Sequence, residues 1–159
     1  TPMKYPWYRA LLTLLITAAA FGAKADNSLQ WQDAWVRAMP PGTTVAAAYG
    51  SVTNPSDAEI TVVGVTSSLG EEAQMHDMIT EGDQRRMVQL NELTIGPGET
   101  LSFQPGGKHI MLMNVSEAPA EGTEVELCAL SANDAADCTL APVMRQAPMA
   151  HDGHGGHHH

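Results

Sequence analysis

The stretch KHIMLMNV, residues 108–115, alternates polar or sulfur-containing side chains with aliphatic ones. In an extended strand, side chains two positions apart point to the same face. Ile110 and Leu112 therefore share one apolar face. The opposite face carries His109, Met111 and Met113. The aliphatic face suits a protein core, so the second face is either another buried surface or a surface that binds a ligand.

Short segments of the same kind recur along the chain and end at clusters of Pro, Gly, Asn and Asp, such as those at residues 40–42, 53–55 and 96–98. No long segment has apolar residues at helical spacing. We expect strands at residues 35–38, 45–52, 59–66, 73–78, 86–90, 99–103, 108–115, 123–130 and 138–144. This pattern predicts an all-β sandwich or barrel of about eight or nine strands.

The first 25 residues have the features of a secretory signal peptide. Lys4 and Arg9 precede an apolar run from Ala10 to Phe21, and residues 23–25 supply small side chains for cleavage. A membrane anchor is the alternative, but the run is shorter than the ~20 residues that span a bilayer. We expect an exported, periplasmic protein without membrane insertion after cleavage. Its parts are the leader at 1–25, one domain at 26–145 and a tail at 146–159.

The chain is strongly acidic, with 18 acidic and 8 basic residues and a formal net charge of −10. Three of the basic residues, Lys4, Arg9 and Lys24, lie in the leader, so the mature domain is more acidic still. Such a surface repels phosphate backbones and matches anionic lipids poorly, which argues against nucleic-acid binding. A cationic ligand or a basic patch on a partner fits better.

The two cysteines, Cys128 and Cys138, flank a turn-rich segment at residues 129–137. If this segment folds as a hairpin, the cysteines lie opposite each other on neighbouring strands. Exported cysteines usually pair, so a disulfide is the preferred interpretation. A metal–thiolate site is the alternative, and it is weakened because neither cysteine has a histidine nearby in the sequence.

The domain contains one more histidine, His76, which also lies among methionines in the sequence MHDM at residues 75–78. Alternation would align His76 with Met78. Imidazole and thioether together form a soft, neutral ligand set that suits Cu(I), whereas Zn²⁺ prefers Cys, His and carboxylate, and Ca²⁺ and Mg²⁺ prefer oxygen. In the alternative interpretation the methionines only fill the core. The residues by themselves leave both interpretations open.

The spacing of four residues resembles a known signature. His76, Met87, His109 and Met111 match, without gaps, the H-x10-M-x21-H-x-M pattern of the periplasmic copper chaperones called PCu(A)C. The resemblance extends over about residues 30 to 145, and it implies a cupredoxin-like Greek-key β-sandwich or barrel with an exposed Cu(I) site. The two histidines would supply nitrogen and the two methionines sulfur.

Further roles follow from the same resemblance. Met75, Met78 and Met113 would be additional sulfurs, lying behind the ligands or making transient contacts during copper transfer. In that family the copper is delivered toward cytochrome c oxidase, either to the subunit that carries the CuA centre or through a Sco-type thioredoxin-fold protein. Copper ions and these proteins are therefore the expected partners.

The tail holds five of the seven histidines of the chain, interleaved with Gly and Asp. They are His151, His154, His157, His158 and His159. Imidazoles on a flexible chain are competent ligands for Cu(II), so we expect the tail to bind that ion. An engineered purification tag is the alternative, although such a tag is normally one longer unbroken histidine run, and PCu(A)C proteins often carry similar His/Met-rich extensions.

The expected function is that of a copper carrier without turnover. A blue-copper electron carrier would need a cysteine followed closely by a histidine, which neither cysteine has. A hydrolase is disfavoured because the G-x-S-x-G motif is absent, and a copper oxidase because methionine ligands favour holding Cu(I). The other interpretations are a metal-free structural sandwich and a periplasmic protein for copper storage or resistance.

Overall fold

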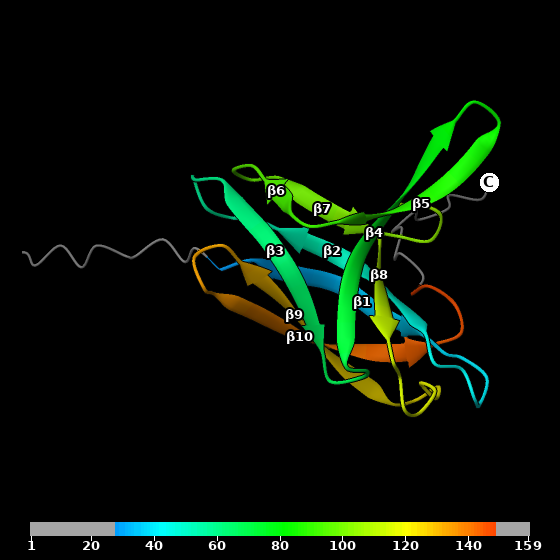
Figure 1. The fold of residues 1–159 in the computed structure, drawn as a ribbon. Helices are drawn as coiled ribbons and strands as arrows, with labels where there is room; N and C mark the ends of the chain where they lie inside the picture. The colour runs from blue at the N-terminus through cyan, green and yellow to red at the C-terminus, as the bar shows by residue number, and fades with distance from the viewer. Residues whose placement is uncertain (1–27, 149–159) are drawn as a thin grey trace, which may run out of the picture.

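The computed structural model describes residues 28–148, and all the regular elements in this range are β-strands (Figure 1). The strands are β1 Gln30–Arg37, β2 Ala46–Thr53, β3 Ile60–Ser67, β4 Glu72–Glu81, β5 Gln84–Leu90, β6 Leu93–Ile95, β7 Thr100–Phe103, β8 His109–Met113, β9 Glu124–Ser131 and β10 Ala136–Met144. Over these residues no helix long and apolar enough to cross a membrane is found. The predicted leader and the five tail histidines lie outside the described residues.

The ten strands form one hydrogen-bonded network with the order β5-β4-β8-β2-β1-β10-β9-β3-β6, and β7 also pairs with β2. β10 joins the two layers, because it pairs with β9 along most of its length and runs parallel to β1 at Val36 and Val143. The two layers face each other in Figure 1, and their buried apolar side chains form a common core. The prediction of an all-β sandwich is confirmed.

The strand count is one higher than the nine segments predicted from the sequence. The additional strand, β6, is only three residues long and lies between Asn91-Glu92 and Gly96-Pro97. Three residues are too few to show an alternating pattern. β6 nevertheless pairs with the first residues of β3, and its last residue, Ile95, is buried in the core.

The aliphatic face of β8 lies in the core as predicted, since Ile110 and Leu112 are completely buried. They contribute to the same apolar cluster as Val36 of β1, Leu127 of β9 and Val143 of β10. Because one face of β8 is fixed in the core by these contacts, the alternation of the strand holds His109 and Met111 on its other face.

β2 pairs with both β7 and β8. Its first residues pair with β8 and its later residues with β7, so β7 and β8 lie end to end along one neighbour. Between them, residues 104–108 form a small loop closed by a hydrogen bond of 2.8 Å from the Gln104 N–H to the Lys108 carbonyl. His109 is therefore the first residue of β8 and directly follows the loop that separates β7 from β8.

β1 has an irregular segment where it crosses β2. The pairing register shifts between Gln32 and Trp35, and Asp33 has a φ of 53°. Ala34 is pushed toward Gly50 of β2, so that a Cβ atom at position 50 would lie only 2.8 Å from the Ala34 Cα. Gly50 also has a φ of 147°, which L side chains rarely adopt.

Cys128 and Cys138 face each other across the β9–β10 hairpin and form a disulfide. The neighbours of Cys128 on β9, Leu127 and Ala129, point into the core, so the sulfurs lie on the outer face of this layer. The hairpin interpretation of residues 129–137 is thus correct, and the disulfide is separate from the histidines and methionines on β4, β5 and β8.

Candidate metal centre

The neighbouring strands β5, β4 and β8 bring both histidines of the domain together. His76 of β4 is the pairing partner of His109 of β8, and Met78 of β4 is the partner of Met87 of β5. Residues that oppose each other in antiparallel strands share a face. Strand alternation then places Met111 on the same face as His109. Residues from three distant parts of the sequence therefore form one His/Met cluster.

Three side chains of this cluster, those of His76, His109 and Met87, are in contact. The rings of His76 and His109 have centroids 5.6 Å apart and lie nearly perpendicular to each other. The Sδ of Met87 lies 3.3 Å from the Nε2 of His109. Met111 is half-buried two positions after His109, and its pairing partner on β4 is Gln74, whose side chain contacts His76.

His76 is the more deeply placed of the two imidazoles, with 9% of its surface exposed. Its Nε2 lies 2.8 Å from the Oε1 of Gln74. Its Nδ1 is fully buried and has no hydrogen-bond partner, and within residues 28–148 it is the one buried side-chain nitrogen or oxygen in this condition. Such an atom is unfavourable unless something binds it. A metal ion bound at Nδ1 would supply the missing partner.

His109 is held by the loop that precedes it. Its Nδ1 lies 2.9 Å from the Gly107 carbonyl oxygen. Since a carbonyl oxygen only accepts, Nδ1 carries the hydrogen, and Nε2 presents its lone pair toward Met87. An imidazole nitrogen and a thioether sulfur that face each other in this way have no hydrogen to share, which suits two ligands of one ion.

The three additional methionines lie in different places. Met78 is half-buried opposite Met87, on the face of the cluster. Met113 is also half-buried on this face, opposite Glu72 at the far end of β8. Met75 is only 3% exposed and packs in the core on the other face of β4, so its sulfur points away from His76. Met75 is therefore a core residue and lies on the face of β4 opposite to the His/Met cluster.

The cluster lies at an open edge of the sandwich. Met87, which is 49% exposed, is carried by the β4–β5 hairpin, which projects beyond the other strands in Figure 1. Two contacts tie the hairpin to the 104–108 loop: Arg85 donates to the Gly106 carbonyl at 2.8 Å, and Lys108 forms an ion pair of 3.3 Å with Asp77. These contacts hold Met87 beside His109 while leaving it accessible from outside.

Gln74 was not identified from the sequence. Its signal is the alternation Glu72-x-Gln74-x-His76, which places three polar residues on one face of a strand. The structure links them in series, because the Gln74 Nε2 donates to Glu72 at 2.7 Å and the Gln74 Oε1 lies beside His76.

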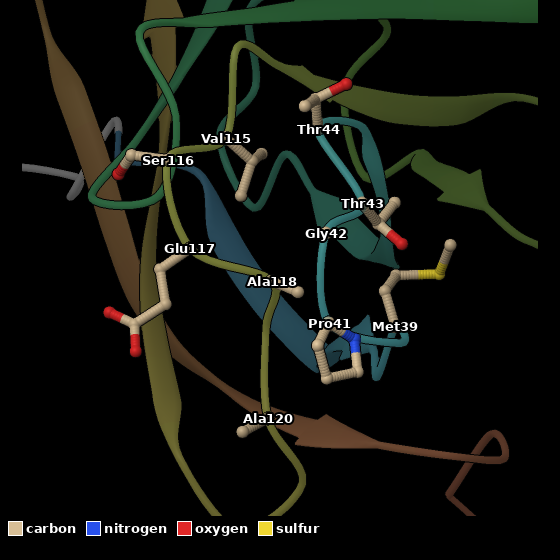
Figure 2. A pocket seen from close by; sticks show the side chains of 10 residues that line it. All are labelled: Met39, Pro41, Gly42, Thr43, Thr44, Val115, Ser116, Glu117, Ala118 and Ala120. Carbon is tan, nitrogen blue, oxygen red and sulfur yellow. The ribbon is translucent and has the colours of Figure 1, made fainter.

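Two other features of the described residues are weaker candidates. Glu126, Cys128 and Cys138 lie close together, but the two sulfurs are bonded to each other and have no thiolate to offer. A shallow pocket of about 450 Å³ lies between the β1–β2 loop and residues 115–120, at the opposite end of β8 from His109 (Figure 2). Its lining is mostly small or apolar and contains no histidine.

Burial, and next the nearby His109, lower the pKa of His76 from 6.5. As the pH falls below 6.5, His76 becomes protonated in the unfolded chain while it stays neutral in the folded chain. The free energy of unfolding of the metal-free protein should therefore decrease as the pH falls below 6.5. Urea unfolding at about pH 7.5 and about pH 5.5 measures this. We expect a smaller decrease for His76→Gln, and an equal decrease in both proteins would contradict the prediction.

The all-strand sandwich is a cupredoxin-like domain. Within that class, the family model "Putative lipoprotein LpqE-like" matches residues 29–143, and the chain belongs to this family. A relative from Leifsonia xyli subsp. xyli, "Putative lipoprotein Lxx21020", is 33% identical over 136 residues, which cover 85% of this chain and 80% of the relative.

Solved structures show the same architecture. The copper-bound PCuAC domain from PmoF2 has a TM-score of 0.62 and 24% identity over 79% of this chain and 97% of that domain. The solution structure of CuI-DR1885 from Deinococcus radiodurans has a TM-score of 0.59 and 28% identity, over 80% of this chain and 83% of that one. The chain thus has the fold of PCuAC domains, and the predicted resemblance to the PCu(A)C proteins is confirmed.

Proposed function

We propose that this protein is a periplasmic copper chaperone that binds Cu(I) through His76, Met87, His109 and Met111. The observation that carries the proposal is the convergence of both histidines with Met87 at one open edge, where the His76 Nδ1 is buried without a hydrogen-bond partner. Copper-bound structures of two proteins with this fold support it.

The donor set favours the monovalent ion. Thioether sulfur is soft and uncharged, and two neutral imidazoles add no negative charge to stabilise Cu(II). The lowered pKa of His76 keeps its ring in the neutral form that metal binding requires. Four protein ligands also complete the shell of Cu(I), which favours a carrier over an enzyme, because a catalytic metal keeps a position open for its substrate.

Release would proceed by ligand exchange from the exposed side. Met87 is the most accessible of the four residues and sits on the projecting hairpin, so a partner's ligand can displace it first while the two histidines still hold the ion. His76 lies deepest and would leave last. A stepwise exchange of this kind avoids free copper at every stage.

The proposal includes the destination of the metal. The receiving protein would be a cytochrome c oxidase subunit that carries the CuA centre, or a Sco-type thioredoxin-fold protein. Mixing the Cu(I)-loaded protein with each apo acceptor and measuring copper on the separated proteins tests this delivery. Retention of all copper by the loaded protein would favour storage instead. The tail histidines would add Cu(II) binding, which a chain truncated after residue 149 would lose.

Anaerobic Cu(I) titration followed by X-ray absorption tests the site itself. We expect one tightly bound Cu(I) with two nitrogen and two sulfur ligands. Met87→Leu should remove one sulfur from the spectrum and weaken binding, whereas Met75→Leu, which deletes a thioether from the core face of the neighbouring strand, should change neither. An unaltered spectrum in Met87→Leu, or equal effects of the two substitutions, would contradict the proposed ligand set.

A further inference from the structure

Glu72, Gln74 and His76 form a hydrogen-bonded series along one face of β4. The Gln74 Nε2 lies 2.7 Å from the Glu72 Oε1, and the Gln74 Oε1 lies 2.8 Å from the His76 Nε2. Glu72 is exposed at the beginning of the strand, while His76 is buried beside His109. The series thus connects a surface carboxylate to the deepest residue of the metal centre.

The order of the groups determines the direction of each hydrogen bond. An ionised carboxylate only accepts, so Glu72 must receive its hydrogen from the amide nitrogen of Gln74. The amide oxygen of Gln74 is then turned toward His76, and because this oxygen also only accepts, the His76 Nε2 must be the protonated nitrogen. The Nδ1 is left with its lone pair, and this is the atom that is buried without a partner.

The two imidazoles consequently present different nitrogens to the centre. His109 has its hydrogen on Nδ1, where the Gly107 carbonyl accepts it, and offers Nε2. His76 has its hydrogen on Nε2 and offers Nδ1. Each ring is fixed by a hydrogen-bond acceptor outside the cluster. For His109 the acceptor is the backbone carbonyl of Gly107, and for His76 it is the side-chain oxygen of Gln74.

We propose that Gln74 and Glu72 are positioning residues that hold His76 in the ring orientation and tautomer in which Nδ1 binds Cu(I). This role rests on the proposed function, since it describes how the same site is prepared for its metal. Partners of this kind orient a ligating histidine and make it a better donor, and their loss typically lowers metal affinity by about 10–100-fold.

Three variants test the proposal in the full chain. Gln74→Leu removes the acceptor of His76 with little change in size. The double exchange Glu72→Gln with Gln74→Glu rebuilds the series, because the amide introduced at position 72 would donate to the carboxylate introduced at position 74, which in turn accepts from His76. Gln89→Leu is the matched control. Gln89 is the pairing partner of His76 on β5, but the hydrogen bond to the His76 Nε2 is made by Gln74 and not by Gln89.

Two measurements are made on each protein. Long-range ¹H–¹⁵N NMR spectra of the metal-free form at one pH above 7 identify which nitrogen of His76 is protonated, and competition with a Cu(I) chelator measures affinity. We expect the Nε2–H form in the wild type, the exchange variant and Gln89→Leu, with affinities within about threefold of one another. For Gln74→Leu we expect a mixture of tautomers and an affinity lower by about 10-fold or more.

The proposal is overturned if wild-type His76 is protonated on Nδ1, or if Gln74→Leu keeps both the tautomer and the affinity of the wild type. It is also overturned if the exchange variant behaves like Gln74→Leu, since the rebuilt series would then have no effect. Because the tautomer is read without metal, failure of the wild type to bind Cu(I) refutes the proposed function and is distinct from these outcomes.

Discussion

Replacing His109 with alanine is expected to lower the Cu(I) affinity by at least about 100-fold, because a direct ligand should matter more than the outer partners whose loss costs 10–100-fold. The substitution removes a nitrogen donor, and it also removes the ring against which the Met87 sulfur packs. His76, Met87 and Met111 would remain, and a soft ion held by fewer ligands exchanges readily with a chelator.

Competition with a chromophoric Cu(I) chelator measures this change. Folding should be preserved, since His109 is only half-buried and starts its strand, while β8 is held in the core by Ile110 and Leu112. Ser102→Ala, on the exposed face of β7 in the same layer, serves as the control and should keep the wild-type affinity. An affinity within tenfold of the wild type for His109→Ala would refute the assigned role.

Gly50→Ala is expected to reduce the free energy of unfolding by about 2–5 kcal/mol, the largest stability effect we predict for a single added methyl group. Two costs combine: backbone strain at a φ of 147°, and overpacking by a Cβ that would lie 2.8 Å from the Ala34 Cα. The neighbouring atom belongs to the backbone of β1, so a side-chain rotation cannot relieve the contact.

Gly82→Ala separates these two costs. Gly82 also has a positive φ, 62°, but no atom lies within 4 Å of the position of its Cβ. This substitution should cost only the backbone term of about 1–2 kcal/mol. Urea unfolding of both variants gives the comparison. If Gly50→Ala is no more destabilising than Gly82→Ala, the close approach of β1 to β2 does not constrain the sandwich.

The fold was largely predictable because its strands alternate strongly and are bounded by turn residues. Residues 108–115 show this most clearly, since their aliphatic members are completely buried in the structure. The β9–β10 hairpin was predictable from the turn residues between the cysteines. β6 was not, because its three residues pair through their backbone and carry no pattern of their own.

The proposed ligand set comes from a spacing signature in the sequence, but the arrangement of its residues required the structure. The resemblance groups Met75 and Met78 together as additional sulfurs, yet they lie on opposite faces of β4: Met78 pairs with Met87, whereas Met75 is buried in the core. The role of Gln74 depends on the direction of two hydrogen bonds, which is a property of side-chain conformation.

The bond between Cys128 and Cys138 also matters for copper. A thiolate binds Cu(I) more strongly than a thioether, so under the proposed function a reduced cysteine would compete with the methionines of the His/Met cluster for the ion. The chain has two cysteines, and they form a disulfide with each other on the outer face of the β9–β10 layer. Within the described residues the cysteine sulfur is therefore oxidised and closed to a metal ion, and a Cu(I) ion bound as proposed would meet thioethers alone as its sulfur ligands.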